Sequence, residues 1–181
     1  MSSRFKRIIW GFDPGQKLGW AVVQEAGRGS FKLLGRGVAD GHDFRALRRL
    51  PYQLLATGGF EPELVAVEVP YLSYGRRPQF SVGVSAGRLE MALYLALPHL
   101  TLLEVPYELW AAEIVGGLSA AKRDFAYRVY FGEEGASEHE RDAALLAVWA
   151  ARAAAVYGLE ALKRRRNVRV WEVRHEGVSG L

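Results

Sequence analysis

The sequence has 181 residues, of which half are apolar, a formal net charge of +4, and no cysteine. A chain of this length can bury one substantial core, and the lack of cysteine excludes a disulfide framework and a thiolate zinc site. No apolar run is long enough to span a bilayer, and the run behind the basic N-terminus ends at Asp13, too soon for a secretory signal. We therefore expect one intracellular, cytoplasmic domain with no membrane partner.

The spacing of apolar residues predicts the order of the elements. Strands are expected at residues 8–13, 19–24, 31–38, 64–68 and 101–105. Helices are expected at residues 43–50, 80–97, 108–115 and 119–130, and from residue 138 onward. Pro51 is expected to kink or end the first helix, although Leu54 and Leu55 could continue it to Gly58-Gly59. This order predicts an α/β fold, in which a mixed five-stranded sheet (three antiparallel strands, then parallel additions) is flanked by helices.

Two of the predicted strands end in an acidic residue. Asp13 follows an apolar run and precedes the turn signal Pro14-Gly15, and Glu68 closes a second apolar run that begins at Leu64. A carboxylate at the end of a buried strand is costly to desolvate unless a cation meets it. Asp13 could instead cap its own turn, and Glu68 could pair with an arginine.

A third acid lies on the last predicted helix. The segment Ser137-Glu138-His139-Glu140 matches a capping box, which places the helix start at this point. The residues three, four and seven positions after Asp142 are apolar, so Asp142 is expected on the inward face, one turn after His139. Alternatively, Asp142 bonds nearby amides and His139 only occupies a helix end.

These acids can converge if the two strands that carry Asp13 and Glu68 are neighbours. Close carboxylates repel one another and raise one another's pKa unless cations neutralise them. Two divalent ions about 3.5–4 Å apart would do so and could cleave a phosphodiester. With no cysteine available, hard cations such as Mg²⁺ or Mn²⁺ are favoured.

Four segments resemble, in order, the RuvC-type Holliday junction resolvases. The resemblance spans roughly residues 8–154, and its segments are Phe12-Asp13-Pro14-Gly15 with Gly19-Trp20, residues 64–68, residues 114–122 and residues 139–144. It implies an RNase H-like fold over residues 1–159, followed by a basic extension at residues 160–181. It also implies a homodimer, in a bacterial cell or a phage-infected host, that nicks four-way junction DNA with Mg²⁺, for which Mn²⁺ can substitute, and two ions per subunit. The catalytic and metal-binding residues that it implies are Asp13, Glu68, His139 and Asp142.

The resemblance and the charge pattern also suggest DNA contacts. Tyr71 falls where the family has an aromatic wedge, although it could fold back on the core, and Lys122 matches a backbone-contacting lysine, although it could be a solvated charge. The loop beyond Tyr71 adds Arg76 and Arg77. The remaining candidates form the basic run of the tail, which could clamp phosphates or simply be solvated: Lys163, Arg164, Arg165 and Arg166.

The chain also departs from the family pattern. The turn after Asp13 is one residue shorter, and Trp110-Ala111-Ala112 stands where the family often has another DNA-contacting lysine. Two other classes remain open: a kinase-like or actin-like ATPase, and a branched-DNA-binding protein without catalysis or a relative that acts on RNA. The many Arg, Glu, Ala and Leu residues and the single asparagine are typical of a thermophilic protein.

Overall fold

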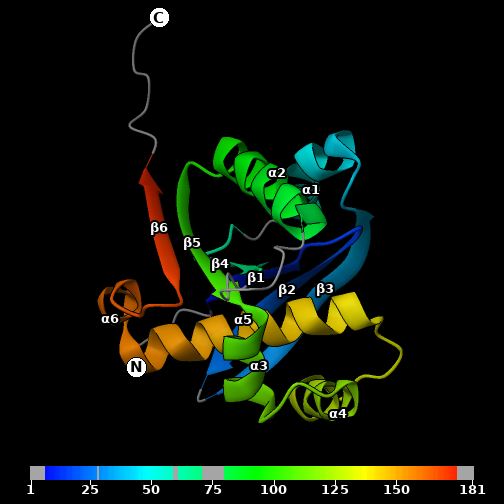
Figure 1. Cartoon of the computed structure of the whole chain (residues 1–181), viewed down its shortest axis with the longest axis vertical. Coiled ribbons are helices and arrows are strands. Elements are labelled where there is room, and N and C mark those ends of the chain that lie inside the picture. Colours follow the sequence, from blue (N-terminus) through cyan, green and yellow to red (C-terminus); the bar gives the residue numbers. More distant parts are fainter. Residues whose placement is uncertain (1–6, 28, 59–60, 71–79, 175–181) are drawn as a thin grey trace, which may run out of the picture.

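The computed structural model describes residues 7–27, 29–58, 61–70 and 80–174. Its centre is a six-stranded mixed sheet with the strand order β3-β2-β1-β4-β5-β6 (Figure 1). The strands are β1 (Ile8–Asp13), β2 (Lys17–Gly27), β3 (Ser30–Asp40), β4 (Leu64–Val69), β5 (His99–Pro106) and β6 (Arg169–Arg174). The first three strands form the expected antiparallel meander, and β4 and β5 add to β1 in parallel. The mixed α/β fold is thus confirmed.

The sheet has six strands, whereas five were predicted. The sixth is β6, which pairs antiparallel with β5, so that Glu104 lies opposite Arg169. Arg169 also forms an ion pair of 3.2 Å with Glu104, and Val170 and Val173 pack against the two opposite cores. Residues 168–173 do alternate as an edge strand does, and the contacts on both faces explain why they join the sheet.

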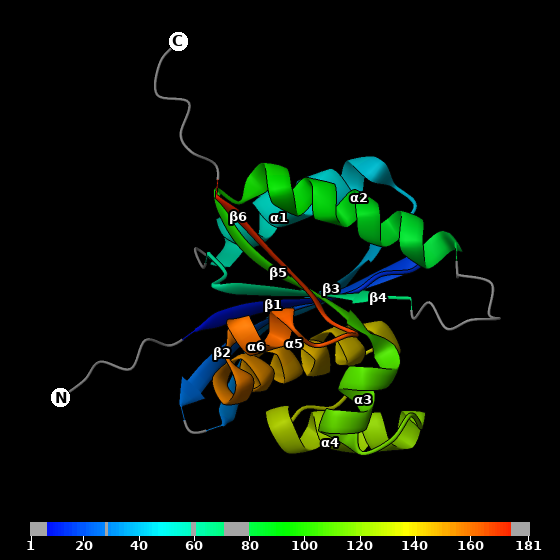
Figure 2. The same cartoon turned by 60° about the vertical axis from the view of Figure 1, so that its left-hand side comes forward.

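Helices cover both faces of the sheet. They are α1 (Phe44–Gly58), α2 (Phe80–Ala96), α3 (Tyr107–Val115), α4 (Ala120–Phe131), α5 (Glu138–Tyr157) and α6 (Leu159–Lys163). Helices α1 and α2 lie on one face, whereas α5 crosses the other face with α3 and α4 outside it (Figures 1 and 2). Among the described residues, no helix is long and apolar enough to cross a membrane.

Pro51 neither ends nor interrupts α1, which continues to Gly58. The continuation to Gly58 that the sequence allowed is the one observed, because Leu47, Leu50 and Leu54 bury one continuous face of the helix. Burying three leucines contributes on the order of 5 kcal/mol, which exceeds the roughly 3 kcal/mol that an internal proline costs.

Candidate active site

The carboxylates of Asp13 and Glu68 project from adjacent parallel strands. In the register of β1 and β4, Phe12 lies opposite Val67, so Asp13 and Glu68 are the next residues along each strand. Side chains alternate along a strand, and two residues before each acid stand Gly11 and Ala66, on the face that α5 covers. Both acids therefore lie on the α5 face, at one edge of the core.

Helix α5 brings its first turn against these strands. The capping box begins the helix at Ser137, whose hydroxyl accepts from the amide of Glu140, while the Glu140 carboxylate accepts from the amide of Ser137. Gly11 of β1 and Gly19 of β2 then allow the backbone of α5 to approach the two strands closely. A Cβ atom at Gly11 would lie 2.0 Å from a carbonyl oxygen of α5, and one at Gly19 would lie 2.1 Å from the carbonyl oxygen of His139.

This approach places His139 directly against Asp13. The ring nitrogen Nδ1 of His139 lies 2.7 Å from Oδ2 of Asp13. Burial raises the pKa of Asp13, and the hydrogen bond to His139 opposes that rise. The same hydrogen bond raises the pKa of His139 and favours the charged imidazolium. Asp13 thus has a side-chain partner on α5 in addition to its position before the turn.

Asp142 is buried one turn further along α5, as its spacing predicted. Its Oδ1 atom lies 3.0 Å from Nε of Arg123 and 3.6 Å from Nε of Arg141. The pKa of Asp142 is raised to about 6, mainly by burial; Arg123 opposes this rise and the charge of Asp13 adds to it. The charges of Asp142 and Asp13 therefore interact across the contact between α5 and the sheet.

Glu68 belongs to the same electrostatic cluster. Its Oε2 atom accepts a hydrogen bond of 2.9 Å from the indole nitrogen of Trp110. Burial, followed by the charge of Asp13, raises the pKa of Glu68 well above its usual value, and the charge of Asp142 adds to this. Asp13, Glu68 and Asp142 thus lie near enough for the charge of Asp13 to act on the other two acids, and His139 lies beside Asp13.

The chemistry of this cluster fits a hard divalent cation. Its donors are carboxylate oxygens and an imidazole, and its acids repel one another. As they stand, no three His, Asp or Glu side chains of the described residues are grouped closely enough to hold a metal. Arg123 supplies the positive charge next to Asp142 instead.

Three residues of this site were missed by sequence reasoning. Trp110 bonds Glu68, Arg123 pairs with Asp142, and Tyr107 contacts both Trp110 and Arg123. Trp110 was noticed only as a departure from the family pattern. Nothing in the sequence around Arg123 distinguishes it from the solvated cations of a surface helix.

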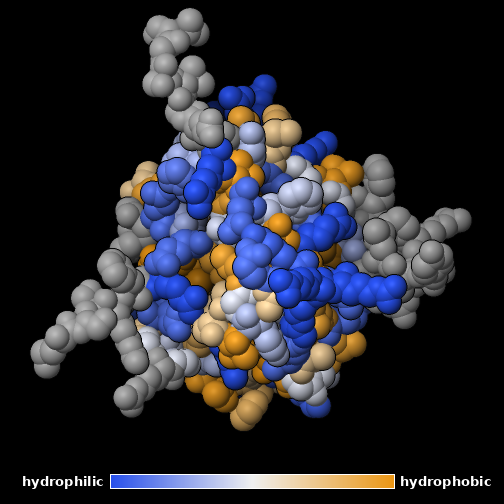
Figure 3. Space-filling model, turned by 90° about the vertical axis from the view of Figure 1, so that its left-hand side faces the viewer, coloured by the Kyte–Doolittle hydropathy of each residue, from blue (hydrophilic) through white to orange (hydrophobic). Residues whose placement is uncertain are grey.

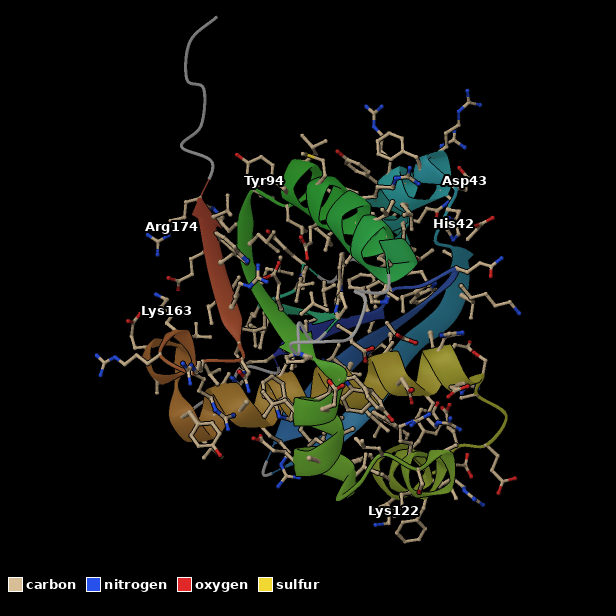
Figure 4. All side chains as sticks on the ribbon, viewed as in Figure 1. His42, Asp43, Tyr94, Lys122, Lys163 and Arg174 are labelled. Atoms are coloured by element: carbon tan, nitrogen blue, oxygen red, sulfur yellow. The ribbon has the colours of Figure 1, made fainter. Side chains whose placement is uncertain are left out.

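A groove of about 870 Å³ opens beside His139. The turn before β2, the end of β3 and the first turn of α5 line it, and its polar side chains include Lys17, His42 and Glu138. His42 stands at the end of β3, as Figure 4 shows. Of the predicted site residues, His139 lines this groove.

The predicted DNA contacts differ in their surroundings. Tyr71, Arg76 and Arg77 lie outside the described residues. Lys122 is exposed on α4, where its Nζ donates to the carbonyl of Gly116 at 3.1 Å (Figure 4). The structure does not bring Lys122 into contact with the carboxylates.

The basic run of the tail divides into two kinds of side chain. Lys163 pairs with Glu160 and Glu172, each at 2.6 Å, and Arg165 pairs with Glu113 at 2.7 Å. Arg164 and Arg166 are exposed and form no ion pair with a described residue. Hydrophilic residues cover much of this side of the molecule, with small hydrophobic patches between them (Figure 3).

Comparison with solved structures identifies the fold class. The RuvC protein of Thermus thermophilus in complex with a Holliday junction substrate superposes with a TM-score of 0.66 and 21% identity over 80% of this chain and 93% of that chain. A second structure of Thermus thermophilus RuvC gives 0.63 and 23% identity over 82% and 95% of the two chains. The yeast mitochondrial Holliday junction resolvase Ydc2 gives 0.50 and 16% identity over 86% and 83%.

The chain therefore has an RNase H-like fold. Within that class, its arrangement is the RuvC-type one, as the resemblance in sequence predicted. No protein-family model and no curated protein matches the chain in sequence.

Proposed function

We propose that this chain is an endonuclease that nicks four-way DNA junctions with divalent metal ions. One observation carries the proposal: three carboxylates, from β1, β4 and α5, lie in one buried region, where burial raises the pKa of each and the charge of Asp13 raises the pKa values of the other two. Such a cluster is unfavourable without cations, and the RuvC-type fold supports junction DNA as the substrate.

Asp13, Glu68 and Asp142 would hold the metal, with His139 beside them. We propose two Mg²⁺ ions per subunit, with Mn²⁺ as a substitute. When bound, such ions activate water and stabilise charge on the phosphate oxygens. The contact with Asp13 orients His139 through Nδ1, and the partly exposed ring leaves Nε2 for a water or a phosphate.

DNA contacts would surround this site. The groove beside His139 can take the strand that is cut, and Lys122 can contact the backbone nearby. Tyr71 would stack at the open centre of the junction, with Arg76 and Arg77 on phosphates. In the tail, Arg164 and Arg166 are better placed to bind phosphate than Lys163 and Arg165, because the latter two already have carboxylate partners.

A homodimer would place two such sites on one junction. The outer face of α2 supports this proposal because it exposes Gly83, Gly87, Met91 and Leu95 at intervals of four residues. Small residues followed by apolar ones allow two helices to approach closely and bury the exposed side chains.

The test is cleavage of a synthetic four-way junction, with a linear duplex as control. We expect nicks in the junction with Mg²⁺, none with EDTA, and little cleavage of the duplex. Asp13→Asn should abolish nicking but leave junction binding intact or tighter, because it removes one negative charge near the phosphate. Junction binding without metal-dependent nicking by the unaltered chain would overturn the nuclease proposal, and nucleotide hydrolysis alone would favour a kinase-like enzyme.

A further inference from the structure

We propose that Arg123, Tyr107 and Trp110 form a positioning frame, which holds the metal-binding carboxylates of Asp142 and Glu68 in place. The frame runs through side chains of α3 and α4 and connects Asp142 to Glu68. This inference rests on the proposed function, because it assigns these residues a role in divalent ion binding at the same site.

The guanidinium of Arg123 is the centre of the frame. It is buried, and it contacts Asp142 at 3.0 Å, Glu138 at 2.6 Å and the carbonyl of Leu118 at 2.7 Å. It also donates to the hydroxyl of Tyr107. These contacts fix the orientation of the guanidinium, and its ion pair with Oδ1 holds Asp142 in turn.

Tyr107 joins this arginine to the second carboxylate. Its ring lies 5.3 Å from the guanidinium of Arg123 and packs edge-on against Trp110 with 5.3 Å between the ring centroids. The indole of Trp110 then donates to Glu68. An unbroken series of contacts therefore leads from α5 through α4 and α3 to β4.

The frame contacts only one oxygen of each acid. Arg123 faces Oδ1 of Asp142, and Trp110 bonds Oε2 of Glu68. No hydrogen bond or ion pair from a described residue engages the other oxygen of either carboxylate, so Oδ2 and Oε1 remain for a cation. Groups that orient metal-binding side chains in this way typically contribute 10- to 100-fold in metal affinity.

The chain contains a matched control for Trp110. The indole of Trp149 is equally buried and donates to Glu113 at 2.8 Å, but Glu113 is not one of the site carboxylates. Trp110→Phe and Trp149→Phe each remove one partly buried indole–carboxylate hydrogen bond. A purely structural role predicts similar changes in both variants, whereas the positioning frame predicts a difference in metal binding alone.

The experiment is calorimetric titration of the full chain with Mn²⁺ in the absence of DNA. We expect Trp110→Phe to weaken Mn²⁺ binding about tenfold and Trp149→Phe to change it less than twofold. The two variants should lower the melting temperature by similar amounts. Tyr107→Phe should weaken binding less than Trp110→Phe. The variant that combines Tyr107→Phe and Trp110→Phe should show a smaller fold-loss of Mn²⁺ affinity than the product of the two single fold-losses. The reason is that both residues act through one series of contacts.

The outcomes separate the two proposals. Equal Mn²⁺ affinity for Trp110→Phe, Trp149→Phe and the unaltered chain would overturn the positioning frame but leave the nuclease proposal standing. An unaltered chain that neither binds Mn²⁺ nor nicks junctions would overturn the proposed function, and the frame with it.

Discussion

Alanine at Gly19 tests the contact that brings α5 to the sheet. The added Cβ would lie 2.1 Å from the carbonyl oxygen of His139 and 2.3 Å from its carbonyl carbon. Ordinary contact begins at 3.4 Å, so the first turn of α5 must move away by about 1.3 Å. Backbone atoms cannot rotate out of the way as a side chain can, and His139 and Asp142 would move with the helix.

The displacement should cost both stability and activity. Overpacking of this kind destabilises by roughly 1–3 kcal/mol. At about 3 °C per kcal/mol for a chain of this size, Gly19→Ala should lower the melting temperature by roughly 3–9 °C. Because a shift of 1 Å in a catalytic group can cost about 100-fold in rate, junction nicking at saturating Mg²⁺ should fall by about that factor.

Gly35→Ala is the matched control, since Gly35 is also a strand glycine. A Cβ atom at Gly35 would meet the ring of Trp20 at 3.5 Å, which is an ordinary contact. This variant should nick junctions normally and be as stable as the unaltered chain or up to about 1 kcal/mol more stable. Normal nicking and an unchanged melting temperature for Gly19→Ala would refute the close packing of α5 on β2.

Three further predictions concern charge and stacking. Burial and the charge of Asp13 raise the pKa of Glu68, so ionisation of Glu68 destabilises the metal-free fold as the pH rises. Glu68→Gln should therefore raise the melting temperature in EDTA at pH 8. This gain should disappear below pH 4.5, where Glu68 is protonated in both the folded and the unfolded chain. Replacing Arg164 and Arg166 by Gln should reduce the slope of the logarithm of the DNA-binding constant against the logarithm of the salt concentration by up to about 2. Lys163→Gln should leave this slope unchanged. Equal slopes for these variants and the unaltered chain would exclude a phosphate clamp in the tail. Tyr71→Ala should weaken junction distortion and cutting more than binding to linear duplex, as measured by fluorescence of labelled junction arms, and equal losses on both substrates would contradict a wedge.

Much of the fold and of the carboxylate cluster was predictable because it depends on local patterns. The apolar run before Asp13 and the one before Glu68 define two buried strands, and the capping box fixes the start of α5 to the residue. Once that start is known, helical spacing alone places Asp142 inward. Only the pairing of β1 with β4 had to be assumed.

The surroundings of the carboxylates were not predictable, because they depend on contacts between distant segments. Trp110 lies 42 residues from Glu68 in the sequence, and Arg123 belongs to a different helix from Asp142. Neither pairing leaves a periodic signal.

The sixth strand has a consequence for synthesis of the chain. Strand β6 covers the β5 edge, but it follows every other element of the described residues in the sequence. While residues 169–174 are still within the ribosome, the backbone groups of β5 along that edge remain unpaired beside Leu100 and Leu102. An open apolar edge is prone to pair with a neighbouring nascent chain, so the closing step of folding is also the step that protects the protein from aggregation.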